Sequence, residues 1–170
     1  MTDWVSHPQI CRAAELLKQQ AVVAYPTESV WGLGCDPQSA SAVEKILQLK
    51  KRNVDKGLIL IADNVVRFKP FLDGLDEEYL RRFQAPTAKP TTWLVPNNGT
   101  APLWISGGRD TLALRITAHP IAAALCTAFG GPLVSTSANP QGLPAAKSAL
   151  EVENYFGAAI DAQAPGRVGE

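Results

Sequence analysis

The sequence contains few of the residues from which disulfide frameworks and metal centres are built. Its three cysteines, Cys11, Cys35 and Cys126, lie far apart, without the paired spacing of a zinc site, and only two histidines are present. We therefore expect free thiols, a cytoplasmic location and no metal held by protein side chains. One histidine, His119, directly precedes Pro120, a position that favours capping of a helix over general-base catalysis.

The sequence also lacks an excess of either charge and lacks long apolar runs. Lys plus Arg and Asp plus Glu number 16 each, so no global field draws the chain toward nucleic acid or anionic membrane. The amino terminus has no apolar signal region, and no apolar run approaches the ~20 residues that cross a bilayer. We expect no contact with membrane, and any site for an anionic ligand has to be local.

The common nucleotide and hydrolase motifs are missing. The sequence has no G-x-x-x-x-G-K-[ST] phosphate loop, no G-x-G-x-x-G after a strand and no G-x-S-x-G elbow. A serine hydrolase built on residues 135–137 would also lack a convincing base. If this protein binds a nucleotide, it uses an arrangement of residues other than these motifs.

The length and the apolar periodicity together predict the fold class. A chain of 170 residues can close one sizeable core but not two ordinary domains, so we predict a single domain over residues 1–170. The periodicity predicts helices at 7–20, 39–50, 65–72, 77–83, 120–129 and 150–156, and strands at 21–25, 57–62, 91–95, 111–116 and 132–135. Because helices and strands interleave without strict alternation, we predict an α/β fold, with α+β as the close alternative, built on a twisted mixed sheet.

A run of cations separates the predicted helix 39–50 from the buried strand 57–62. Lys50, Arg52 and Lys56 would therefore lie near the sheet, where a guanidinium fork and ammonium charges suit a triphosphate. Arg115 lies in the alternating strand 111–116, on the side opposite to its apolar neighbours. The alternative for the cationic run is a solvated helix face.

Hydroxyl side chains gather where the predicted strand 132–135 ends. Ser135, Thr136 and Ser137 are followed by Asn139 and by the turn residues Pro140 and Gly142. Hydroxyls and backbone amides at a strand end suit phosphate oxygens or an amino-acid carboxylate. The same residue types also favour turns for local reasons, and the residues alone leave both interpretations open.

Taken in order, these segments resemble the threonylcarbamoyl-AMP synthase family, also called the YrdC-like family, and most closely its short single-domain bacterial type. The likeness covers roughly residues 10–156 and rests on YPTESVWGLG at 25–34, LKKR at 49–52, KGLILIA at 56–62, KPTTW at 89–93, DTLALR at 110–115 and PLVSTSAN at 132–139. It implies helices and a mixed sheet around a basic concave cavity. Family members commonly have threonine at position 29 and continue into a segment that closes over the substrates; on this resemblance we expect that closing segment to be absent here.

The resemblance implies a nucleotidyltransferase that makes L-threonylcarbamoyladenylate from L-threonine, bicarbonate or CO₂, and ATP with Mg²⁺. The product would serve threonylcarbamoyladenosine modification of tRNA and pass to a tRNA threonylcarbamoyl-transferase complex. By matching positions, the resemblance implies signature cavity residues Lys50, Arg52, Ser137 and Asn139, ATP contacts Arg52, Lys56, Thr111 and Ser137, and threonine contacts Ser29, Arg115 and Ser135.

The main alternative is an RNA-binding or ribosome-maturation module that uses the same basic cavity, because the family has been linked to RNA binding as well. Against this alternative, the net charge is zero and the four tryptophans are scattered rather than interleaved with cations. Salt separates the two interpretations, since RNA binding weakens steeply as salt rises and a buried triphosphate site responds less.

Overall fold

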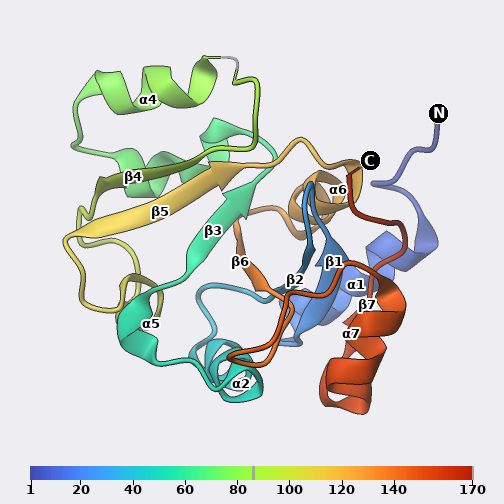
Figure 1. Ribbon diagram of the computed structural model, residues 1–170. Helices are drawn as coiled ribbons and strands as arrows, with labels where there is room; N and C mark the ends of the chain where they lie inside the picture. Colours follow the sequence, from blue (N-terminus) through green and yellow to red (C-terminus); the bar gives the residue numbers. More distant parts are fainter. Residues whose placement is uncertain (86, 170) are drawn as a thin grey trace.

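A computed structural model of the protein describes residues 1–85 and 87–169. Its sheet has seven strands in the order β4-β5-β3-β6-β2-β1-β7 (Figure 1). The strands are β1 (Val23–Pro26), β2 (Trp31–Gly34), β3 (Ile59–Ala62), β4 (Thr92–Pro96), β5 (Thr111–Ile116), β6 (Leu133–Ser137) and β7 (Ala162–Gln163). β3 runs parallel to β5 and β1 parallel to β7, and the remaining neighbours pair antiparallel. The predicted α/β fold with a mixed sheet is confirmed.

The helices of eight residues or more start at side-chain caps that their sequences provide. They are α1 (Pro8–Lys18), α2 (Ala40–Lys50), α3 (Lys69–Leu72), α4 (Glu77–Gln84), α5 (Leu103–Ser106), α6 (Pro120–Phe129) and α7 (Ala149–Phe156), with 3-10 turns η1 (Val54–Lys56), η2 (Val65–Phe68) and η3 (Gly157–Ala159). The side chain of Ser39 accepts a hydrogen bond from the amide of Ala42, and that of His119 accepts one from the amide of Ile121. The predicted capping role of His119 is confirmed. None of the helices in the described residues is long and apolar enough to span a bilayer.

Two strands and one α-helix were not predicted, and one strand is shifted. β2 contains two glycines, which have low strand propensity, but it lies between β1 and β6 and is stabilised by pairing with both. β7 and α5 are too short to give a periodic signal. The strand predicted at 21–25 spans Val23–Pro26 instead, since Pro26 is tolerated at the end of a strand, opposite Trp31.

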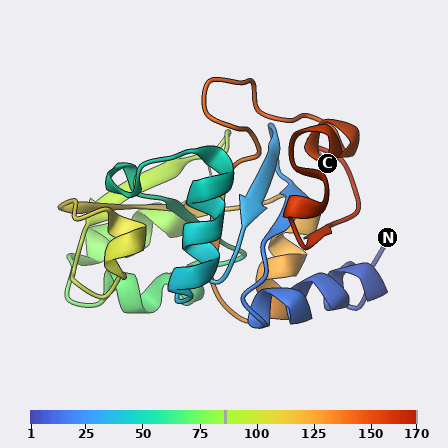
Figure 2. The ribbon, with the colours of Figure 1, turned by 90° about the horizontal axis from the view of Figure 1, so that it is seen from below.

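Different helices cover the two faces of the sheet. On one face, α1 and α6 pack against each other and cover Tyr25, Ile61 and Leu133 (Figure 2). On the other face, α2 and α7 contribute to a core that includes Leu60 of β3. Since β3 supplies residues to both cores, it is a central strand covered on both sides, and the prediction of a buried strand at 57–62 is confirmed.

The α1–α6 layer leaves part of its own face of the sheet bare. Ser135 pairs with Ile59, and Arg115 pairs with Ile61, so these residues share the face that α1 and α6 cover elsewhere. Farther along the same face, Leu94 of β4 is 63% exposed. The uncovered ends of β3, β5 and β6 therefore form the floor of a concavity.

Candidate active site

A cavity of about 420 Å³ lies over the bare part of the sheet. Its floor comes from β2, β3, β5 and β6, and its walls come from the β1–β2 turn, the segment after α2 and the start of β4. The lining residues are Thr27, Ser29, Val30, Gly32, Arg52, Leu58, Ile59, Pro90, Thr92, Arg115, Ser135, Thr136 and Ser137. Two guanidinium groups and several hydroxyl groups thus surround one space, a combination suited to anionic ligands. Every predicted threonine contact, namely Ser29, Arg115 and Ser135, lines this cavity.

The segment after α2 places Arg52 beside the sheet. Lys51 has φ of +53°, which ends the helix in the left-handed conformation, and the amide of Arg52 donates to the carbonyl of Leu47. The Arg52 Nη2 donates to the carbonyl of Gly57 at 3.1 Å, while its Nε is buried and finds no partner among the described residues. Burial, followed by the nearby charge of Arg109, lowers the pKa of Arg52. The Arg52 guanidinium therefore presents its positive charge to the cavity, and nearby groups neutralise little of that charge.

Lys50 supports the site from behind rather than lining the cavity. It is only 4% exposed, and its Nζ donates to the carbonyls of Ser137 and Asn139 at 2.6 and 3.1 Å and to Asn139 Oδ1 at 3.0 Å. Ser137 Oγ in turn donates to Asn139 Oδ1 at 2.6 Å. The structure therefore brings together Lys50, Ser137 and Asn139, and this network ties the end of α2 to the loop after β6 so that Ser137 stays at the cavity.

The charge of Lys50 is sensitive to its surroundings. Burial, with the positive charge of Arg52 as the second cause, lowers the pKa of Lys50 to about 8. The ammonium donates to four oxygen atoms but faces no carboxylate in the described residues. An anion bound nearby would favour the protonated form.

Arg115 is held by a residue that the sequence did not single out. Its Nη1 lies 3.3 Å from Oε2 of Glu28, and Thr117 Oγ1 donates to the other oxygen of Glu28 at 2.9 Å. Arg115 and Glu28 are 15% and 17% exposed at the side chain. The pair fixes one edge of the guanidinium and leaves its other donors available to a ligand carboxylate. The sequence signal for Glu28 was its position next to Ser29, but only the fold places it beside Arg115.

A second cavity of about 140 Å³ adjoins the first and shares Arg52, Leu58 and Ile59 with it. Lys56 and Thr111, two of the predicted ATP contacts, line this second cavity together with Arg109. Arg109 was not predicted as a site residue, because it follows Gly107 and Gly108, and this pair of glycines indicates an ordinary loop. Among the described residues, none of the cations of the two cavities except Arg115 forms an ion pair.

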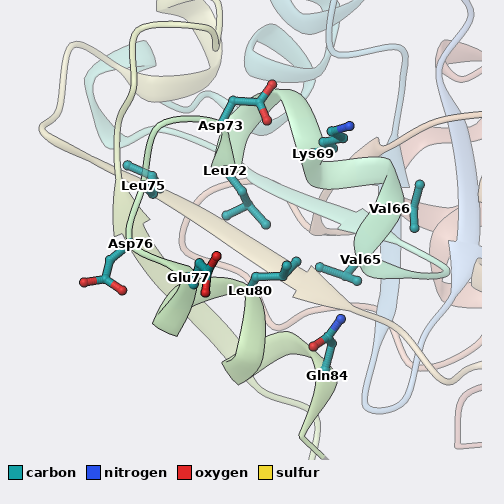
Figure 3. A pocket seen from close by; sticks show the side chains of 10 residues that line it. All are labelled: Val65, Val66, Lys69, Leu72, Asp73, Leu75, Asp76, Glu77, Leu80 and Gln84. Atoms are coloured by element: carbon teal, nitrogen blue, oxygen red, sulfur yellow. The ribbon is translucent and has the colours of Figure 1, made fainter.

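A groove of about 320 Å³ elsewhere on the molecule does not suit the same chemistry. It lies between the η2–α3 segment and α4, and aliphatic side chains such as Val65, Leu72 and Leu80 point into it (Figure 3). Asp73, Asp76 and Glu77 lie around it, and Lys69 is its one lining cation within the described residues. We assign the chemistry to the two polar cavities, because they bring cations and hydroxyl groups together and this groove does not.

Residues 1–85 and 87–169 contain no group of three or more His, Cys, Asp or Glu side chains that could hold a metal ion. The groups that converge on the two cavities are guanidinium, ammonium and hydroxyl groups, which bind phosphate and carboxylate oxygens.

Comparisons with known proteins find a family model and relatives that match nearly the whole chain. A family model of the Sua5/YciO/YrdC domain, described as telomere recombination, matches residues 15–167. A threonylcarbamoyl-AMP synthase of Cellvibrio japonicus is 52% identical over 169 residues, which are 99% of this chain and 89% of the relative. The synthase of Halorhodospira halophila is 55% identical over 161 residues, 95% of this chain and 84% of the relative.

A solved structure extends the similarity to three dimensions. The structure of P. abyssi Sua5 complexed with L-threonine superposes with a TM-score of 0.86 at 31% sequence identity. The match covers 94% of this chain and 47% of the Sua5 chain, so this chain spans about half the length of that protein.

Proposed function

This chain belongs to the Sua5/YciO/YrdC family, and from that premise we propose that it is an L-threonylcarbamoyladenylate synthase. It joins L-threonine, bicarbonate or CO₂, and ATP, and it releases pyrophosphate. The observation that carries the proposal is that relatives 52% and 55% identical over almost the whole chain bear the name threonylcarbamoyl-AMP synthase. The protein is accordingly an enzyme of the nucleotidyltransferase class that acts in tRNA modification.

The larger cavity supplies the groups that threonine requires. We assign the threonine carboxylate to Arg115, whose remaining guanidinium donors can form a charge-assisted pair with it. Ser29 and Ser135 supply hydroxyl groups to the same space. A pocket that hydrogen-bonds the substrate hydroxyl discriminates strongly against amino acids that lack one.

The reaction that follows needs positioning and charge stabilisation more than it needs an acid or a base. The neutral amine of threonine attacks the carbon of CO₂, a proton leaves the nitrogen, and a carbamate forms. A carbamate oxygen then forms a bond to the α-phosphorus of ATP while the bond from that phosphorus to the bridging oxygen breaks. Pyrophosphate leaves with the bonding electrons, and Arg52 and Lys56 stabilise its charge.

Mg²⁺ fits this scheme as a partner of ATP. Because cations and hydroxyl groups face the cavities, we propose that phosphate oxygens hold the ion, which neutralises part of the triphosphate charge. The product is a mixed anhydride that water hydrolyses, so we further propose that it passes to a tRNA threonylcarbamoyl-transferase complex in the cytoplasm. Enclosure in the cavity would protect the carbamate from water until it attacks the α-phosphorus of ATP.

The proposed function is tested by measuring pyrophosphate release from ATP with Mg²⁺ and bicarbonate, with L-threonine, with L-serine or with no amino acid. We expect release that depends on threonine and is slower by about 10- to 200-fold with serine, which keeps the hydroxyl and lacks only the methyl group. Release that ignores threonine, or no release while ATP binds, would contradict the proposal. If the chain instead bound RNA with a steep salt dependence and did not bind ATP, the RNA-binding alternative would replace it.

The lowered pKa of Lys50 predicts a pH dependence of ATP binding. Above about pH 7.5 the phosphates of ATP are fully ionised, since their last pKa lies near 6 to 7. Lys50 loses its proton as the pH rises through its pKa of about 8, and a neutral amine attracts the phosphates less. Because a bound anion raises that pKa, we expect the affinity for ATP to fall about fivefold or more between roughly pH 7.5 and 9.5.

Calorimetric titrations of ATP at several pH values check this prediction. The variant Lys50→Met, verified as folded by circular dichroism, should bind ATP more weakly at neutral pH and show a much flatter profile. The same slope in the wild type and in the variant would assign the titration to another group.

A further inference from the structure

The groove between the η2–α3 segment and α4 has no part in the proposed reaction. It shares no lining residue with either polar cavity among the residues that the structure describes. Phe68 of η2 and Phe83 of α4 pack into the core that includes Leu60, so the groove belongs to the layer on that face of the sheet. The larger cavity, with Arg115, lies over the opposite face. A molecule bound in the groove would therefore leave that cavity open.

Aliphatic side chains from both walls of the groove point toward one another (Figure 3). Val65, Leu72 and Leu75 are half-buried, whereas Val66 is 72% exposed and Leu80 is 40% exposed. Single exposed aliphatic residues are ordinary on a protein surface, but a contiguous set that lines one groove indicates a contact surface for another molecule. The groove thus offers apolar surface that the described fold does not cover.

The helix α4 divides its residues between the core and the groove. Tyr79 and Phe83 are half-buried against the core, while the groove is lined by Glu77, Leu80 and Gln84, which are three and four residues apart. This spacing places the second set along one face of the helix. No residue between Glu77 and Gln84 is buried, so α4 keeps this face open to a partner.

The rim of the groove is acidic. Asp73, Asp76 and Glu77 lie around the apolar side chains, and Lys69 is the one cation among the described lining residues. None of the three carboxylates forms an ion pair within the part of the chain that the structure describes. Such a rim repels the phosphates of nucleic acids and of anionic membranes, and it attracts lysine and arginine side chains. The occupant that fits is a protein segment with apolar anchors and flanking cations.

We propose that this groove is a docking site for a basic amphipathic helix of a partner protein. A groove with helical walls and an apolar floor is the geometry in which such a helix lays its apolar face, with anchors at i, i+3 or i+4, and i+7. The apolar anchors of the partner pack on Val66 and Leu80, and its lysine or arginine side chains face Asp73 and Glu77. This docking goes beyond the proposed synthase activity and does not depend on it.

The experiment measures the binding of two synthetic peptides to the full chain by fluorescence anisotropy. Each peptide has about 14 residues, enough for roughly four helical turns, and carries leucines at i, i+3, i+4 and i+7 along one face. The other positions are lysine and alanine in the first peptide, and glutamate and alanine in the second. We expect the lysine peptide to bind with a Kd of about 10 to 100 μM and the glutamate peptide to bind at least about tenfold more weakly.

Matched variants locate the bound peptide. Leu80→Gln removes the apolar anchor and keeps a good helix former, and Leu80→Met keeps an apolar side chain of similar size. Leu150→Gln is the control, since Leu150 is 69% exposed on α7 and does not line the groove. We expect Leu80→Gln to weaken binding of the lysine peptide about tenfold, with Leu80→Met and Leu150→Gln within about twofold of the wild type.

A double neutralisation tests the acidic rim. Asp73→Asn with Glu77→Gln should weaken binding of the lysine peptide about three- to tenfold at low salt and less at high salt, because exposed charges are screened. Glu15→Gln with Glu44→Gln removes the same amount of charge from exposed positions of α1 and α2 and should have little effect. Asp76 is left intact because its side chain caps α4.

Three results would overturn the proposal. The first is a lysine peptide that binds more weakly than about 1 mM, or no better than the glutamate peptide. The second is equal affinity in Leu80→Gln and Leu150→Gln, which would place the peptide elsewhere on the molecule. The third is self-association, or binding to phosphatidylglycerol vesicles, that Leu80→Gln abolishes in sedimentation, which would assign the groove to a second copy of the chain or to a membrane.

Thermal unfolding shows whether each variant is folded, and the comparison of the two peptides on the wild type holds even if Leu80→Gln is not. Folded Leu80→Gln should keep threonine-dependent pyrophosphate release at the wild-type rate, because Leu80 lines neither polar cavity. A wild-type protein that binds the lysine peptide through Leu80 but releases no pyrophosphate would keep the docking site and lose the synthase assignment. Pyrophosphate release without peptide binding would have the opposite meaning.

Discussion

Replacing Arg52 with alanine is expected to lower the rate of adenylate formation by about 10²- to 10³-fold, the loss typical when a donor that stabilises developing charge is removed. Among the described residues Arg52 is the one cation that lines both cavities, and its Nη2 is already fixed by the carbonyl of Gly57. In the proposed reaction its charge stabilises the leaving pyrophosphate, so the loss should appear mainly in the rate of the chemical step.

Single-turnover measurements of threonylcarbamoyl-adenylate at saturating ATP and threonine check this expectation. Lys51→Asn is a matched control, since Lys51 is exposed, adjacent and in the left-handed conformation that asparagine tolerates. It should remain within about threefold of the wild type, because a cation outside the cavities acts only through screened charge. An Arg52→Ala enzyme as fast as this control would refute the assignment of Arg52.

Replacing Arg115 with alanine is expected to raise the KM for threonine by about 100-fold or more and to leave the affinity for ATP nearly unchanged. The reason is that truncating one partner of a buried, hydrogen-bonded charge pair costs about 2–5 kcal/mol of binding energy. Arg115 faces the larger cavity only, on the side of Ser29 and away from Lys56. Steady-state kinetics with threonine and ATP varied in turn check this division.

Glu28 provides the control for a purely structural effect. Arg115→Ala leaves Glu28 without its ion-pair partner in a site where its side chain is only 17% exposed, which also costs stability. The double variant Glu28→Gln with Arg115→Ala should regain thermal stability but not threonine affinity. Recovery of the threonine KM in the double variant would show that Arg115 acts through folding and not through the carboxylate.

The sequence predicted which residues belong to the site better than it predicted which groups their side chains contact. Ser29, Arg115 and Ser135 line one cavity as expected from the resemblance, and hydropathy alternation alone placed Arg115 opposite to its apolar neighbours. Lys50 was predicted as a phosphate cation, and its position in the cationic run does not reveal where its side chain points. The structure shows that its ammonium donates to the loop after β6.

Arg109 and Glu28 could not be found from local patterns. Each becomes significant through a partner far away in the chain: Arg109 is 54 positions from Asp55, and Glu28 is 87 positions from Arg115. Sequence periodicity reports which side of an element is apolar, but it carries no information about which loops meet across a sheet. The role of Gly107 is hidden for the same reason, since the backbone that lies close to it, and that a Cβ would meet, belongs to another segment, residues 54–57.

The sequence by itself determined most of the helices and strands, the mixed α/β fold and the local anion chemistry, because these follow from the spacing of apolar side chains and from the kinds of side chain present. Only the tertiary structure decided that α1 and α6 stop short of the ends of β3, β5 and β6, and that the exposed floor is divided into two cavities joined at Arg52. Both features depend on strand register and on helix packing, which are set by contacts between distant residues.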